Sequence, residues 1–90
     1  MFEKRINYYF AKKLGLEITR ILAAKHPSFD FTYKISHKYL KIYVSSDFGI
    51  RFMLLDEIPI CECLRELINP SAQIRYMEIH LNCVFNKLKL

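Results

Sequence analysis

The sequence predicts an α+β fold: a two-layer sandwich with the element order α-β-β-β-α-β, in which two helices cover one face of a sheet built on an antiparallel hairpin. Residues 2–25 have apolar side chains at helical spacing, whereas residues 29–44 and 74–85 alternate apolar and polar side chains. Because each predicted strand has one apolar face, both helices must lie on the same side of the sheet. Ninety residues suffice for one core, so we expect a single domain over residues 1–90.

The first predicted helix spans residues 2–25. Gly15 lies inside it and costs about 1 kcal/mol relative to Ala, which makes this position a candidate for a kink or a break. Pro27 ends the helix, because the residue before a proline disfavours helical backbone. The face opposite the core has a basic stripe that contains an aromatic ring, formed by Arg5, Tyr8 and Lys12. The apolar stripe consists of Phe2, Ile6, Phe10, Leu14, Ile18 and Ile21.

The hairpin is predicted over residues 29–44, with the chain reversing at Ser36–His37. This reversal pairs Tyr33 with Leu40, Phe31 with Ile42 and Phe29 with Val44. All large apolar side chains then share one face, and a slip of one residue would move them to the other. The outer face carries Asp30, Thr32, Lys34, Tyr39, Lys41 and Tyr43.

The second half of the chain contributes a strand, a helix and a last strand. Alternation over residues 50–55 favours a third strand, although Met and Leu also suit a helix. Asp56 is a suitable N-cap for a helix that ends before Asn69-Pro70. Residues 74–85 are predicted as a long strand that adds Tyr76 and His80 to the outer face of the sheet.

If residues 50–56 were helical instead, the order would be α-β-β-α-α-β, which is similar to that of type II KH domains. The KH signature is a Gly-x-x-Gly loop that clamps the nucleic-acid backbone. Only Gly15 and Gly49 are present, so that loop is absent. The aromatic RNP patterns of the RRM are missing too, and the sequence indicates membership of neither family.

The composition is that of a folded, basic protein. Hydrophobic residues make up 52% of the chain, which argues against disorder. The net charge of +5 is uneven, since residues 1–46 hold nine Lys/Arg and three Asp/Glu, and residues 47–90 hold five and six. An acidic or phosphate-bearing partner would therefore meet the first half. No apolar run is long enough for a membrane span or a signal peptide, so we expect a soluble, cytoplasmic protein that does not bind membranes.

The three cysteines are expected to be free thiols, because their number is odd and nothing indicates secretion. A zinc site from Cys61, Cys63, His80 and Cys83 is disfavoured by geometry. On a helix, Cys61 and Cys63 are about 200° apart. On a strand, His80 and Cys83 point to opposite faces. We expect neither a metal nor another cofactor.

Tyrosines beside lysines on an uncovered sheet face are typical of single-stranded RNA readers, because rings stack on bases and amines bind phosphates. Our first interpretation is therefore a small, non-catalytic RNA- or nucleic-acid-binding module. Its expected binding residues are Arg5, Tyr8, Lys12, Lys34, Tyr39, Lys41, Tyr43, Tyr76 and His80.

Two alternatives remain open. Tyr is also enriched at protein interfaces, so the same face suits a second copy of the chain or a larger partner that the protein inhibits or scaffolds, as small phage and mobile-element proteins do.

No nucleotide-binding or hydrolase motif is present, so we do not expect an enzyme. A small endoribonuclease needs only a base, an acid and a cation, which His37 or His80 would supply with Tyr43 and Lys41.

Overall fold

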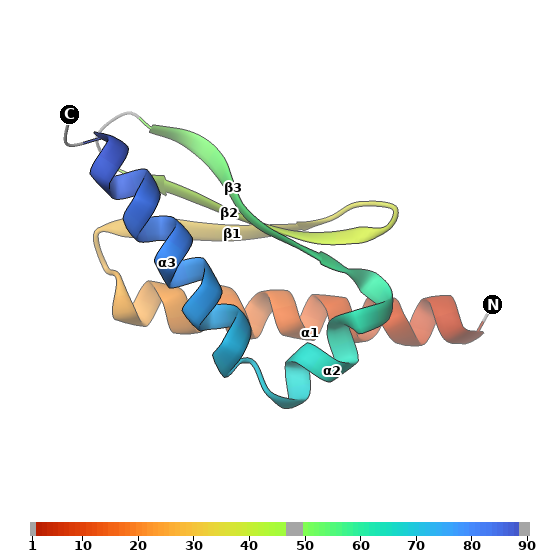
Figure 1. Ribbon diagram of the computed structural model, residues 1–90. Coiled ribbons are helices and arrows are strands. Elements are labelled where there is room, and N and C mark those ends of the chain that lie inside the picture. The colour runs from red at the N-terminus through yellow and green to blue at the C-terminus, as the bar shows by residue number, and fades with distance from the viewer. Residues whose placement is uncertain (1, 47–49, 89–90) are drawn as a thin grey trace.

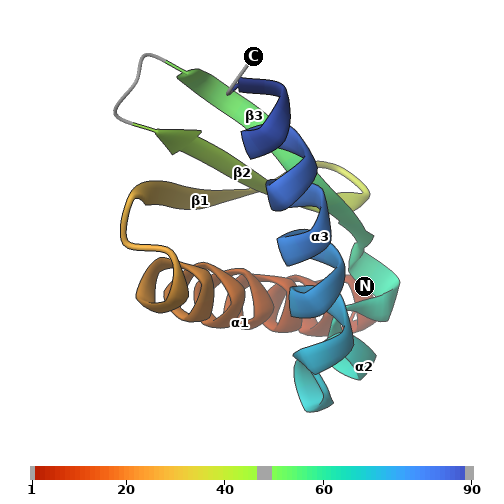
Figure 2. The ribbon, with the colours of Figure 1, turned by 60° about the vertical axis from the view of Figure 1, so that its left-hand side comes forward.

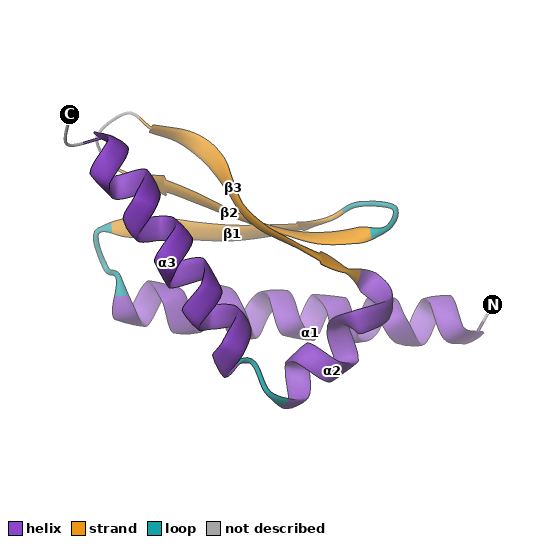
Figure 3. Cartoon of the chain, viewed as in Figure 1, coloured by secondary structure: helices purple, strands orange, loops and turns teal. Residues whose placement is uncertain are grey.

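Within residues 2–46 and 50–88, which the computed structural model describes, the chain forms three α-helices, a short 3-10 helix and a three-stranded antiparallel sheet (Figures 1 and 3). The predicted α+β class is confirmed. The sequence also predicts a second turn over residues 45–49: Ser45 and Ser46 belong to β2, and residues 47–49 lie outside the described residues. The elements in chain order are α1 (Phe2–Lys25), β1 (Phe29–Ile35), β2 (Tyr39–Ser46), β3 (Ile50–Pro59), η1 (Ile60–Glu62), α2 (Cys63–Ile68) and α3 (Ser71–Leu88).

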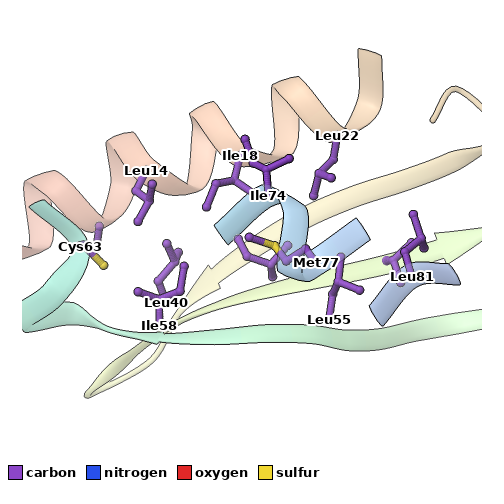
Figure 4. Packing of buried hydrophobic residues seen from close by; sticks show 13 residues of the cluster. Leu14, Ile18, Leu22, Leu40, Leu55, Ile58, Cys63, Ile74, Met77 and Leu81 are labelled. Atoms are coloured by element: carbon purple, nitrogen blue, oxygen red, sulfur yellow. The ribbon is translucent and has the colours of Figure 1, made fainter. Parts of the chain in front are cut away.

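Two long helices cover one face of the sheet. Figures 1 and 2 show α1 running below the strands, while α3 crosses from α1 towards the far end of β3. Side chains from α1, β2, β3 and α3 meet in one hydrophobic cluster, so both helices pack on the same side (Figure 4). The fully buried members include Leu14, Ile18, Leu22, Leu40, Ile42, Leu55, Ile58 and Met77. No described element covers the other face of the sheet (Figures 1 and 2).

The hairpin is confirmed, but its predicted register is wrong by two residues. The chain reverses at His37–Lys38, one residue later than predicted, and the Ser36 N–H donates to the Tyr39 carbonyl at 2.9 Å. The observed pairs are Ile35 with Leu40, Tyr33 with Ile42 and Phe31 with Val44. Since side chains alternate with a period of two, a two-residue shift leaves every side chain on its predicted face.

Residues 50–55 form a strand as predicted, which rules out the α-β-β-α-α-β order, but the strand continues to Pro59. The helix predicted to begin at Asp56 is therefore wrong at its start: Asp56 pairs with Ile42, and the helical segment begins with η1 at Ile60. The extra length lets Ile58 pair with Leu40 and become buried. A bulge opposite Ile42 and Tyr43 inserts Leu55 into the buried face.

The predicted last strand over residues 74–85 is wrong, because this segment lies within the helix α3, Ser71–Leu88. Two apolar patterns overlap in it. Met77, Ile79 and Leu81 alternate like a strand, whereas Ile74, Met77 and Leu81 recur at helical spacing. The second pattern decides the structure, since Ile74, Met77 and Leu81 complete the core while Ile79 is 59% exposed.

Polar contacts fix α3 against β3 and α1. The Nδ1 of His80 lies 2.7 Å from the Leu55 carbonyl oxygen, which can only accept, so Nδ1–H is the donor. The Gln73 amide donates to Asp56 Oδ2 at 2.9 Å. Burial raises the pKa of Asp56 above its ordinary value. Glu78 reaches α1 at its C-terminal end, where its Oε2 lies 2.9 Å from His26 Nε2.

The helix predicted over residues 2–25 is confirmed, and α1 continues through Gly15 without a break. This glycine permits a close approach between α1 and β1 instead. A Cβ at this position would lie 2.7 Å from two ring carbons of Tyr33 and 3.1 Å from Leu40 Cδ1. The missing side chain therefore makes room for the Tyr33 ring, and this close packing is the structural reason for the glycine.

Candidate nucleic-acid interface

The open face of the sheet brings aromatic rings and cations together in rows across the strands. Thr32 pairs with Tyr43, and Lys34 pairs with Lys41. Two lysines directly opposite each other repel. That repulsion is relieved on one side only, because Lys41 Nζ lies 3.6 Å from Glu57 Oε1 on β3. Lys34 is exposed and has no carboxylate within ion-pair distance among the described residues.

A shallow hollow of about 420 Å³ lies on this face, lined by Thr32, Tyr33, Lys34, Tyr43 and Phe52. We call it the sheet hollow. Phe52 is 60% exposed, although a large apolar side chain on a strand usually turns towards the core. The sequence did not predict an exposed Phe52. Strict alternation would place Phe52 on the same face as the buried Ile58, but the bulge in β3 between them reverses the alternation, so Phe52 faces outward. The sequence feature that pointed to an exposed apolar side chain was the run of four apolar residues at 52–55, because alternate residues of a strand face opposite sides of the sheet.

The N-terminal half of α1 supplies the predicted basic stripe. Arg5 and Lys12 are exposed, and Tyr8 between them is 47% exposed. Neither cation has a carboxylate within ion-pair distance in the part of the chain that is described. Lys13 lies over the ring of Tyr9, 5.0 Å from its centroid. The unneutralised Arg5 and Lys12 beside the exposed ring of Tyr8 favour an anionic, aromatic ligand, whereas the ring of Tyr9 already has Lys13 as its partner.

A second and larger cavity joins α1 to the sheet. Its volume is about 580 Å³, and we call it the end groove because it lies where the hairpin reverses. The Ile60 N–H donates to the Lys38 carbonyl at 2.9 Å and so fixes the start of η1 against the hairpin turn. Tyr8 and Tyr39, predicted on separate surfaces, both line this groove. The lining residues are Asn7, Tyr8, His37, Lys38, Tyr39, Pro59, Ile60 and Cys61.

Tyr76 and His80 do not belong to the open face, which corrects their predicted position. Both lie on α3, on the other side of the sheet, because residues 74–85 are helical. Tyr76 is 56% exposed, and His80 is held by the Leu55 carbonyl. His80 therefore does not lie beside Tyr43 and Lys41, as a ribonuclease site built on these three residues would require. His37 lies in the end groove, and Lys41 and Tyr43 lie along the sheet.

The thiols are separate from this surface, apart from Cys61 at the end groove. Cys61, Cys63 and Cys83 are free, and only Cys63 is buried. Burial raises the pKa of the Cys63 thiol to about 12, so it stays protonated and unreactive near neutral pH. Within residues 2–46 and 50–88, no three His, Cys, Asp or Glu side chains are grouped as metal ligands would be.

Comparisons of the chain with protein-family models, with curated proteins and with solved structures found no match. No helix in the described part of the chain is both long enough and apolar enough to cross a lipid bilayer.

Proposed function

We propose that the protein is a non-catalytic module that binds single-stranded nucleic acid, with RNA as its first expected ligand, in the cytoplasm. One observation carries the proposal: the uncovered sheet face presents the rings of Tyr43 and Phe52 beside Lys34, a cation without an acidic partner among the described residues. Rings of this kind stack on unpaired bases, and an unneutralised amine binds phosphate. The basic stripe of Arg5 and Lys12 supplies further positive charge on α1, which lies on the other side of the sheet.

The test measures binding of a labelled oligouridylate of about ten nucleotides by fluorescence anisotropy. Affinity should fall steeply between about 50 and 200 mM salt, because each neutralised phosphate contributes about −0.7 to the logarithmic salt slope for single strands. Lys34→Gln should reduce the slope by about that amount. Arg75→Gln is the matched control, since it removes the same charge from an exposed position on α3.

Aromatic stacking is tested separately. Phe52→Ala should weaken binding by about five- to 150-fold, because stacking on a ring contributes about 1–3 kcal/mol per base. Tyr76→Ala is the matched control, since Tyr76 is 56% exposed compared with 60% for Phe52 but lies on α3. Binding that is independent of salt, or equal losses for Phe52→Ala and Tyr76→Ala, would contradict the proposal.

A second candidate function, docking on a protein, is favoured by the outward face of α2 and α3. Ile68 is 77% exposed and Ile79 is 59% exposed, on helices whose other side faces the core. Exposed apolar side chains on a helix suit a protein partner, including a second copy of the chain. Sedimentation velocity tests whether two copies of the chain form a dimer through this face. If they do, Ile79→Ser should dissociate the dimer, whereas Phe52→Ser should not.

A further inference from the structure

The end groove is formed by helix, turn and strand residues together, whereas the sheet hollow is lined by strand residues. Three segments that are distant in sequence form its walls: the N-terminal half of α1, the hairpin turn and the junction between β3 and η1. The Ile60 N–H donates to the Lys38 carbonyl and joins the η1 wall to the hairpin turn, and the Ser36 N–H donates to the Tyr39 carbonyl within the turn. Its volume of about 580 Å³ is within the range of about 300–1,000 Å³ that is usual for small-molecule sites. The groove is therefore large enough to enclose a nucleotide-sized group.

The chemistry of the lining indicates which group fits. Tyr8 and Tyr39 supply two aromatic rings, and Asn7 supplies an amide that both donates and accepts. Lys38 supplies a cation, and no Asp or Glu is among the lining residues. Arg5 lies three residues before Tyr8 on the same helix, so its guanidinium adds positive charge near this wall. A planar, hydrogen-bonding ring with an attached anion complements such a site.

We propose that the end groove holds one unpaired base of the bound strand, with the rings of Tyr8 and Tyr39 packed against the base and Lys38 and Arg5 binding the adjacent phosphates. This inference rests on the proposed function and adds a specific base site to it. Tyr39 connects the two parts, because it lines the groove and also lies on the outer face of β2, about 13 Å along the strand from Tyr43. One continuous strand is thus able to reach both cavities.

The experiment uses the same oligouridylate with a single 2-aminopurine near its middle, whose fluorescence is quenched when the base stacks. Tyr8→Ala should weaken binding by about five- to 150-fold and restore the fluorescence. Tyr9→Ala is the matched control, because Tyr9 is the adjacent residue, is 55% exposed compared with 47% for Tyr8, and does not line the groove. Neither ring belongs to the buried core, so both variants should fold.

The outcomes separate the base site from the function. If Tyr8→Ala behaves like Tyr9→Ala while Phe52→Ala still weakens binding, the base site is wrong and the proposed function stands. If the wild-type chain does not bind the oligonucleotide, both are wrong. If a short polyglutamate peptide binds, and Tyr8→Ala weakens that binding but not RNA binding, the groove belongs to a protein partner and the base site is again wrong.

Discussion

The two halves of α1 have the same apolar spacing but different surroundings. In the C-terminal half, Leu14, Ile18 and Leu22 are fully buried against the sheet and α3. In the N-terminal half, Ile6 continues the same stripe at the same spacing but is 49% exposed. Figure 1 shows the reason, since α1 extends past the end of the sheet towards its N-terminus. The side chain of Phe2, the first residue of the predicted stripe, lies outside the described part.

This difference shows what an apolar stripe can predict. The spacing specifies which side of a helix is apolar, but not whether another element lies against that side along its whole length. Arg5, Tyr8 and Lys12 lie in the same N-terminal half as Ile6, and the end groove opens beside it. The same helix is thus buried against the sheet along its C-terminal half and becomes exposed towards its N-terminus.

The largest expected effect comes from truncating equivalent side chains in the two halves. Ile18→Ala should lower the free energy of unfolding by about 2–5 kcal/mol, because it opens a cavity in a filled core. Ile6→Ala should change it by less than about 0.5 kcal/mol, since that side chain is half exposed. Urea denaturation of both variants measures the difference. Similar losses at the two positions would show that the N-terminal half is covered in solution.

An intermediate effect is expected at the boundary between the halves, at Gly15. Overpacking a filled core costs about 1–3 kcal/mol, and Ala recovers about 1 kcal/mol of helix propensity. Gly15→Ala should therefore lower the free energy of unfolding by about 1 kcal/mol, because its Cβ would meet the Tyr33 ring at 2.7 Å.

The control for Gly15 is a double-mutant cycle in denaturant unfolding. In a Tyr33→Ala background the ring is gone, so adding Ala at position 15 should stabilise the chain instead. A stabilising Gly15→Ala in the wild-type background would contradict the close approach of α1 and β1.

The hairpin shows how much of the fold the sequence can predict. Alternation identified both strands and assigned every side chain to its face. It left the register open by two residues, because a period of two cannot distinguish pairings that differ by a whole period. Ser36, His37 and Lys38 contain no strong turn signal, so nothing local fixed the reversal.

Residues 74–85 show where prediction from sequence fails. Met77 and Leu81 satisfy both the strand pattern and the helix pattern, and only the presence of α1 and β3 determines which face is covered. The error moved Tyr76 and His80 to the wrong side of the sheet. The end groove was unpredictable for a related reason, because it unites residues as distant as Tyr8 and Cys61 through tertiary packing alone.

The smallest expected effect concerns the charges of the two halves. Arg5 and Lys12 lack acidic partners among the described residues, whereas Lys25 and His26, at the other end of α1, contact Glu78 at 3.5 and 2.9 Å. The hydrogen bond with His26, assisted by the charge of Lys25, holds the pKa of Glu78 below its ordinary value of 4.5. The folded chain therefore binds fewer protons at Glu78 than the unfolded chain does.

It follows that the stability from Glu78 is fully present above its ordinary pKa of 4.5 and is lost as the pH falls through its lowered folded value. Glu78→Gln should lower the free energy of unfolding by up to about 1 kcal/mol at neutral pH. The difference from wild type should shrink as the pH falls below 4.5 and Glu78 of the wild type takes up protons, which urea denaturation at pH 7 and at pH 3 would measure. Glu17→Gln is the control, because Glu17 pairs with Arg20 within α1 and joins no second element. An equal loss for Glu78→Gln at both pH values would mean that the carboxylate charge does not hold α3 to α1.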